Sequence, residues 1–140
     1  MNRKIKQILL VAFILVAAVI AIGCTGKGKR VISWSDKLTT SVQRLQDQRL
    51  ISEQEAHDIK SGISDVRAGG VEYDAIEQEV AVTKEQKLSK QQRLTAVAQK
   101  IIESGRRLEQ EGVLHVKNEQ ARKDLETGFR IADIAALLAG

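Results

Sequence analysis

Hydrophobic residues recur every three or four positions along much of the chain, and this spacing predicts four helices. The four stripes comprise Leu38, Val42 and Leu45; Ala56, Ile59, Ile63 and Val66; Leu94, Val97, Ile101 and Leu108; and Ala121, Leu125, Phe129, Ala132 and Ala136. Residues at this spacing share one face of a helix, which then packs on a neighbour. The chain contains no proline, the residue that most disrupts helices. We therefore expect an all-α fold.

Polar residues that cap helices mark three of the expected starts. Ser52 and Glu55 form a capping box, in which the serine side chain accepts a hydrogen bond from a backbone N–H and the glutamate reaches back. Asn118 is a candidate cap for the fourth helix, and the polar stretch 33–36 offers caps for the first. The helical domain is accordingly expected over residues 35–140.

Glycines predict two helix ends, and the stretch between the second and third helices is ambiguous. Gly69-Gly70 is expected to end the second helix, and Gly112 the third, because glycine adopts a left-handed C-cap at low cost. Within 71–90 a helical stripe continues, although residues 80–82 also suit an extended segment. The polar stretch Lys84 to Arg93 is expected to be either a solvated helix or a mobile link.

Two similar segments indicate the topology of the domain. Residues 45–51 and 108–114 each combine a helix end with an apolar pair, and each is followed by a Ser or Asn cap and Glu-Gln. This is the pattern of an αα-hairpin, in which sequential helices pack side by side. We expect a small bundle of about four helices in two antiparallel hairpins, following an N-terminal hydrophobic segment.

The N-terminal segment has the pattern of a membrane-targeting signal. Three basic residues, Arg3, Lys4 and Lys6, precede an apolar run from Ile8 to Ile22. As a helix these fifteen residues would cover about 22 Å. A bilayer hydrocarbon core is about 30 Å thick, so the run is short for a spanning helix and suits a cleaved signal. Residues 1–23 are therefore expected to be a signal peptide or membrane anchor.

The end of this segment, Ala21-Ile22-Gly23-Cys24, resembles the lipobox of a bacterial lipoprotein signal peptide. The resemblance implies cleavage before Cys24 and attachment of acyl chains, including palmitate, to that cysteine. Thr25 stands where an inner-membrane retention signal has aspartate, which favours the outer membrane or cell surface. The alternative is an uncleaved single span over residues 8–26, about 28 Å long.

Charge is concentrated next to this segment. The whole chain carries a net charge of +4, but three basic residues precede Cys24 and three more lie in the expected flexible basic tether, residues 24–34. The remainder is slightly acidic. Basic residues beside an anchor suit anionic lipid headgroups, and a near-neutral domain argues against nucleic-acid binding.

No motif with recognisable chemistry follows Cys24. Glu53 and His57 lie one helical turn apart, but a metal site needs a third ligand and His115 is distant in sequence. Neither a nucleophile elbow nor a phosphate-binding loop is present in the sequence. We therefore expect no enzymatic activity, no cofactor and no metal.

Small residues recur every fourth position near the end of the chain, at Gly128, Ala132, Ala136 and Gly140. On a helix they would form a ridge that another backbone can approach closely. The ridge predicts either a partner or self-association surface, or a close crossing within the bundle.

Together these features predict a membrane-anchored, lipid-attached bacterial envelope protein with a structural or protein-interaction role. One alternative is a single-span membrane protein whose helical domain belongs to an assembly or lysis apparatus. A second is a small helical bundle that holds a ligand in an apolar cavity.

Overall fold

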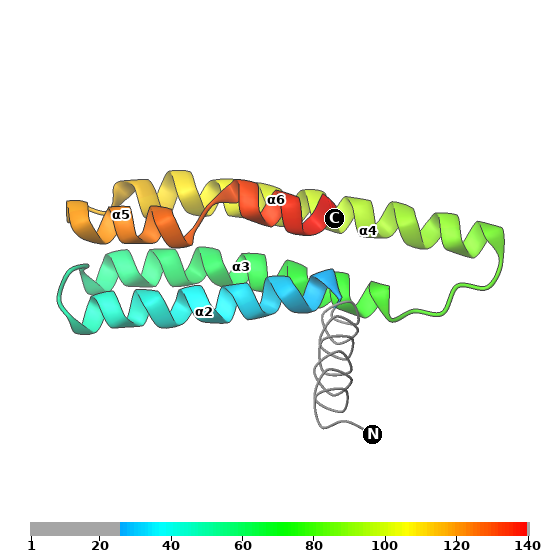
Figure 1. The fold of residues 1–140 in the computed structure, drawn as a ribbon, viewed down its shortest axis with the longest axis horizontal. Helices are drawn as coiled ribbons and strands as arrows, with labels where there is room; N and C mark the ends of the chain where they lie inside the picture. The colour runs from blue at the N-terminus through cyan, green and yellow to red at the C-terminus, as the bar shows by residue number, and fades with distance from the viewer. Residues whose placement is uncertain (1–25, 140) are drawn as a thin grey trace, which may run out of the picture.

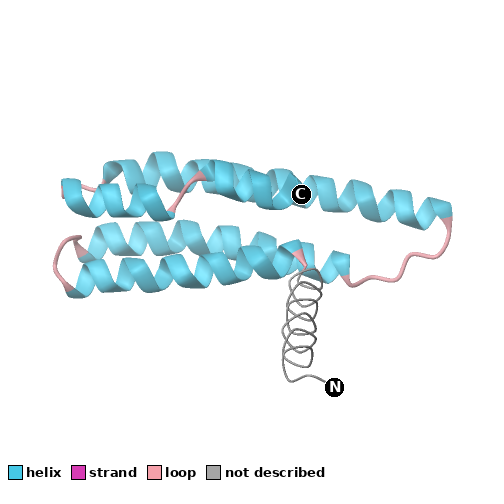
Figure 2. Ribbon diagram, in the orientation of Figure 1, coloured by secondary structure: helices cyan, strands magenta, loops and turns pink. Residues whose placement is uncertain are grey.

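All secondary structure in the computed structural model, which describes residues 26–139, is helical, as the apolar stripes predict (Figures 1 and 2). The elements are α2 Lys27–Asp47, α3 Glu53–Glu77, α4 Lys84–Arg107, a π-helix η1 Leu108–Gly112, a 3-10 turn η2 Val113–His115, α5 Glu119–Gly128 and α6 Ile131–Ala139. The all-α prediction is confirmed.

The helices form two antiparallel hairpins that stack as two layers. One layer contains α2 and α3, and the other contains α4 with α5 and α6 returning along it (Figure 1). Across the layers α3 packs against α4, and α2 contacts α5 and α6. The predicted pair of hairpins is confirmed, but the predicted fourth helix is divided into α5 and α6 between Gly128 and Ile131.

The turn of the first hairpin follows the sequence pattern closely. Arg49 has a left-handed backbone with φ 58°, and the N–H of Leu50 donates to the carbonyl of Leu45 at 2.9 Å. Ser52 then caps α3, since its Oγ accepts from the Glu55 N–H at 3.1 Å. A Glu55 carboxylate oxygen accepts from the Ser52 N–H at 2.9 Å. The predicted capping box is confirmed.

The same Glu55 carboxylate joins the two hairpins. Its second oxygen accepts a hydrogen bond from the backbone N–H of Lys117 at 2.9 Å. Desolvation opposes ionisation of Glu55, but the hydrogen bonds from the Ser52 and Lys117 backbones outweigh it and lower the pKa below its ordinary value. The predicted Asn118 cap follows directly, with Oδ1 accepting from the Ala121 N–H at 2.9 Å.

Helix α2 begins earlier than expected, at Lys27 rather than near residues 33–36. Residues 27–34 of the predicted flexible tether are therefore helical, and that part of the prediction is wrong. Val31 and Ser35 are buried on the same face as the later stripe, so packing extends the helix backward. Ser35 acts as an interior residue, and its hydroxyl donates to the Val31 carbonyl at 2.8 Å.

Helix α3 passes through Gly69-Gly70 and ends at Glu77, so the predicted end at these glycines is wrong. Neither glycine has a positive φ. A Cβ on Gly69 would lie 2.5 Å from Ile101 Cγ1, and one on Gly70 would lie 2.9 Å from Val31 Cγ1. The glycines therefore provide room for close contact with α4 and α2.

The polar stretch from Lys84 to Arg93 is helical, which excludes the mobile-link alternative. Thr83 caps this helix: its Oγ1 accepts from the Gln86 N–H at 3.1 Å, and Gln86 Oε1 accepts from the Thr83 N–H at 3.2 Å. The regular α-helix ends at Arg107, and η1 carries the backbone on to the predicted end at Gly112.

The core is aliphatic and follows the predicted stripes. Ile59 and Ile63 of α3, Ile101 of α4 and Leu125 of α5 are at most 1% exposed. One aromatic contact joins the layers, Trp34 to Phe129, with ring centroids 5.3 Å apart. This continuous core holds both hairpins in one unit.

Candidate functional site at the proximal end of the bundle

The start of α2, the end of α3 and the end of α6 meet at one end of the bundle, here called the proximal end. Lys27 Nζ donates to the carbonyl oxygen of Leu138 at 3.1 Å, which joins α2 to α6. Because the segment that contains Cys24 immediately precedes Lys27 in sequence, this end determines how the bundle is presented to the predicted membrane.

The N-terminus of α2 is capped by a side chain from another helix. Gly26 occupies the N-cap position and has no side chain to serve there. The Glu77 carboxylate takes this role: Oε1 accepts from the Gly28 N–H at 2.8 Å, and Oε2 accepts from the Lys27 N–H at 3.3 Å. A carboxylate at a helix N-terminus satisfies free N–H groups and complements the positive end of the helix dipole.

A glycine crossing brings α2 directly against α3 at the same place. A Cβ on Gly28 would lie 2.4 Å from the Asp74 backbone nitrogen and 2.6 Å from the Gly70 carbonyl oxygen. Gly70 is the matching residue on α3, and both glycines are buried. The first turn of α2 is therefore held by backbone contact as well as by the Glu77 cap.

The end of α3 is tied to α4 by basic side chains. Lys90 Nζ donates to the carbonyl oxygens of Glu77 and Glu79, each at 2.8 Å. The Arg93 guanidinium binds both carboxylate oxygens of Glu79, at 2.5 and 2.9 Å. Hydrogen bonding to Arg93 lowers the pKa of Glu79, which therefore stays ionised over the neutral range. These contacts fix the direction in which α4 leaves the loop.

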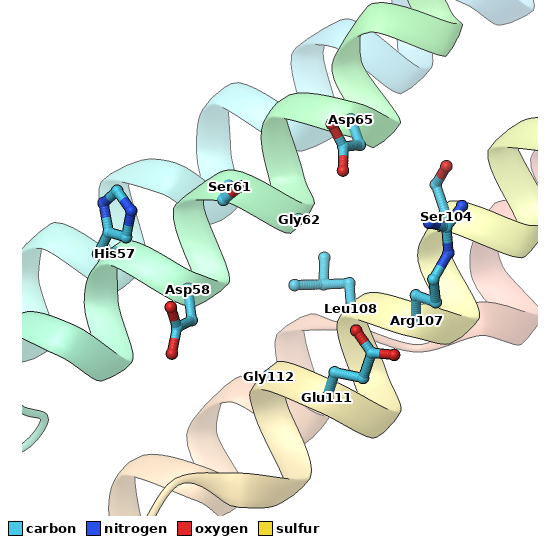
Figure 3. Close-up of a pocket in the computed structure, with 10 residues that line it drawn as sticks. All are labelled: His57, Asp58, Ser61, Gly62, Asp65, Ser104, Arg107, Leu108, Glu111 and Gly112. Carbon is cyan, nitrogen blue, oxygen red and sulfur yellow. The ribbon is translucent and has the colours of Figure 1, made fainter.

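A polar groove lies elsewhere, between α3 and the π-helical end of α4 (Figure 3). Its volume is about 370 Å³, and its lining includes His57, Asp58 and Asp65 from α3 with Arg107 and Glu111 opposite. These five side chains are solvent-exposed. The groove resembles an ordinary solvated surface between helices.

The π-helix that borders this groove packs closely against α3. A Cβ on Gly62 would lie 2.7 Å from Leu108 Cδ1, so the side chain of Leu108 fills the space above the glycine. Within residues 26–139 no group of three His, Cys, Asp or Glu side chains is placed to hold a metal ion. Glu53 and His57 therefore gain no third ligand within this part of the chain.

The predicted small-residue ridge is not continuous. Gly128 ends α5, whereas Ala132 and Ala136 belong to α6, and all three are exposed. A Cβ on Gly128 would touch only Leu38 Cδ1, at 3.8 Å. A close crossing of the bundle at these residues is therefore not found, and the partner surface stays a prediction. Cys24 and Gly140 lie outside the described residues.

Sequence reasoning missed the crossing that the bundle does contain, at Gly28 and Gly70. The pair Gly26 and Gly28 suggested a flexible tether, although glycine is equally suited to close helix contact. The sequence signal for this crossing is that Gly28 precedes Val31, Ser35 and Leu38 at helical spacing.

Among residues 26–139, no helix is both long and apolar enough to cross a membrane. Comparison with protein-family models, curated proteins and solved structures finds no match to this chain.

Proposed function

We propose that the protein is a bacterial envelope component, attached to a membrane by lipid on Cys24, whose helical bundle has a structural or protein-interaction role without catalysis. The lipobox resemblance at Ala21 to Cys24 supports the attachment. The absence of a nucleophile, metal or phosphate motif in the sequence supports a non-catalytic role.

The observation that carries this proposal is the short distance in sequence between Cys24 and the held first turn of α2. Only Thr25 and Gly26 separate Cys24 from α2, and the first turn of α2 is held by Glu77 and by the Gly28 crossing. Three residue steps span about 10 Å at most. A bundle held this close to its anchor suits a scaffold at the membrane surface better than a module that reaches distant partners.

The test is the intact mass of the protein extracted from membranes, with wild type compared with Cys24→Ala. The proposal expects a mass equal to residues 24–140 plus acyl groups for wild type, and loss of that species in the variant. A full-length, unmodified mass for both proteins would refute lipid attachment.

The elongated shape of the domain supports the alternative, a single-span protein with an assembly or lysis-related domain. The polar stretch from Lys84 to Arg93, which interrupts the apolar pattern, is a continuous part of helix α4, Lys84–Arg107. Such a protein would retain residues 8–26 as a span, so the same mass measurement separates the two functions.

Lipid attachment also carries a proposal for location. Thr25 after the cysteine favours the outer membrane or cell surface over the inner membrane. Separation of inner and outer membranes, followed by immunodetection in each fraction, tests this location.

The exposed residues Gly128, Ala132 and Ala136 are the candidate face for a protein partner or a second copy.

A further inference from the structure

Helix α4 begins well beyond the other helices at the proximal end (Figure 1). Gly28 is level with the turn between Gly70 and Asp74, and α2 starts one residue earlier at Lys27. Helix α3 therefore continues about 6 Å past the start of α2 before it ends at Glu77. Lys90 lies beside that end, because its Nζ binds the carbonyl oxygens of Glu77 and Glu79. The six residues before Lys90 carry α4 about 9 Å further. Lys84 therefore lies about 15 Å beyond the start of α2.

The projecting segment, residues 80–90 and here called the α4 projection, exposes apolar side chains. Val80 is 86% exposed, Val82 73% and Leu88 60%. Single exposed hydrophobic residues are ordinary, but three of the five large ones in residues 26–139 lie in this short segment.

Lysines accompany these apolar residues. Lys84 and Lys87 stand in the first turn of α4, with Glu85 as the one acid there, and both lysines are exposed. Within the described part of the chain neither lysine forms an ion pair. Apolar side chains beside unpaired lysines suit the boundary between acyl chains and anionic headgroups.

With Cys24 attached to lipid, chain length keeps this segment close to the membrane. Cys24 can lie no more than about 10 Å from Lys27, whereas Lys84 lies about 15 Å beyond the start of α2. If the bundle stood upright, Lys84 would sit at least about 5 Å below Cys24, which is about the depth of the headgroup layer. Charged side chains in hydrocarbon are costly, so an upright bundle is disfavoured, and a tilted bundle can keep the projection in the headgroup layer.

We propose that the α4 projection is a second membrane contact, in which Val80 and Val82 enter the interface and Lys84 and Lys87 bind anionic lipid headgroups. This inference rests on the proposed attachment at Cys24. The occupant is the membrane that holds the anchor, and the two contacts together set the tilt of the bundle.

The experiment uses the full-length, membrane-extracted protein with Val82→Cys, labelled with a polarity-sensitive dye and reconstituted into phosphatidylglycerol-containing vesicles. An acylated Cys24 has no free thiol, so the dye reports on residue 82. Leu114→Cys is the matched control: Leu114 is 48% exposed and lies at the opposite end of the bundle. Headgroup-level nitroxide lipids serve as quenchers.

The inference expects a blue shift at residue 82 and loss of most of its fluorescence to the nitroxide lipids, with neither change at residue 114. Protein that floats with vesicles but shows equal quenching at both positions would overturn the contact and leave the anchor standing. A blue shift without nitroxide quenching would also overturn it, because another protein copy would then cover the site.

Failure of the anchor is seen separately. Wild-type protein that fails to float, or whose Cys24 accepts the dye, refutes lipid attachment. If the chain floats with a free Cys24, the same quenching comparison in a Cys24→Ser background tests the α4 projection in the single-span protein.

Discussion

Replacing Gly28 with alanine tests the closest helix contact in the bundle. The new Cβ would lie 2.4 Å from the Asp74 nitrogen, 2.6 Å from the Gly70 oxygen and 2.7 Å from the Asp74 Cα. All three are backbone atoms of α3, so no side-chain rotation can relieve the overlap. Ordinary contacts begin at 3.4 Å, so the first turn of α2 must retreat by about 1 Å.

The change in the free energy of unfolding combines two destabilising effects and one stabilising effect. Overpacking in a close contact destabilises by about 1–3 kcal/mol. Retreat of α2 also weakens the hydrogen bonds from the Gly28 and Lys27 N–H groups to Glu77, each worth about 1 kcal/mol. Alanine offsets up to about 1 kcal/mol because it is the better helix former. We expect a net loss of about 2 kcal/mol in the free energy of unfolding.

The assay is urea unfolding of the full-length protein in a fixed detergent, followed by far-ultraviolet circular dichroism. Gly128→Ala is the control, since its Cβ would meet only Leu38 at 3.8 Å. The control should be neutral or stabilise by up to about 1 kcal/mol. If Gly28→Ala proves as stable as Gly128→Ala, the two helices do not cross at backbone contact and the reasoning is wrong.

Three further changes test other parts of the bundle, each by the same unfolding measurement. Glu77→Gln should lower the free energy of unfolding by about 1 kcal/mol, because it removes the charge that caps α2. Glu103→Gln, at an exposed position without such a role, should change it little, and equal effects of the two substitutions would exclude the cap. Because the pKa of Glu55 is lowered in the folded state, its contribution to stability is present above about pH 4.5 and is lost as the pH falls through the folded-state pKa. Glu55→Gln should remove that part of the dependence of stability on pH, and an unchanged dependence would contradict the role of Glu55. Ile59→Ala should lower the free energy of unfolding by about 2–5 kcal/mol because it leaves a cavity in the core, whereas Val71→Ala, at an exposed position, should lower it by about 0.5 kcal/mol or less. A small loss at residue 59 would mean that α3 packs differently.

Features that depend on neighbours in sequence were predictable. The apolar stripes place the core faces of the helices, and the Ser52 capping box and Asn118 cap act within three residues. The Thr83 and Gln86 capping box has the same spacing and was open to the same reasoning. A cap of this kind requires no knowledge of the rest of the fold.

The misplaced boundaries involve partners that are distant in sequence. Helix α2 has no cap of its own, and Glu77, which supplies one, lies 49 positions beyond Gly28. Gly69-Gly70 resembles a helix end when read alone, but it lies where α4 and α2 approach α3. Local propensity predicts a stop there, and tertiary packing overrides it.

The candidate site divides in the same way. The short linkage from Cys24 to Lys27, the apolar Val80 and Val82, and the lysines beside them are all visible in the sequence. The position of these residues relative to one another is not visible in the sequence, because it depends on the register of α4 against α3 and of α3 against α2. The sequence by itself determined that the chain forms helices with apolar faces after a lipobox-like segment. Only the tertiary structure decided that α2 begins at Lys27, since contacts across the bundle hold its first turn, and only the tertiary structure carries α4 past that turn.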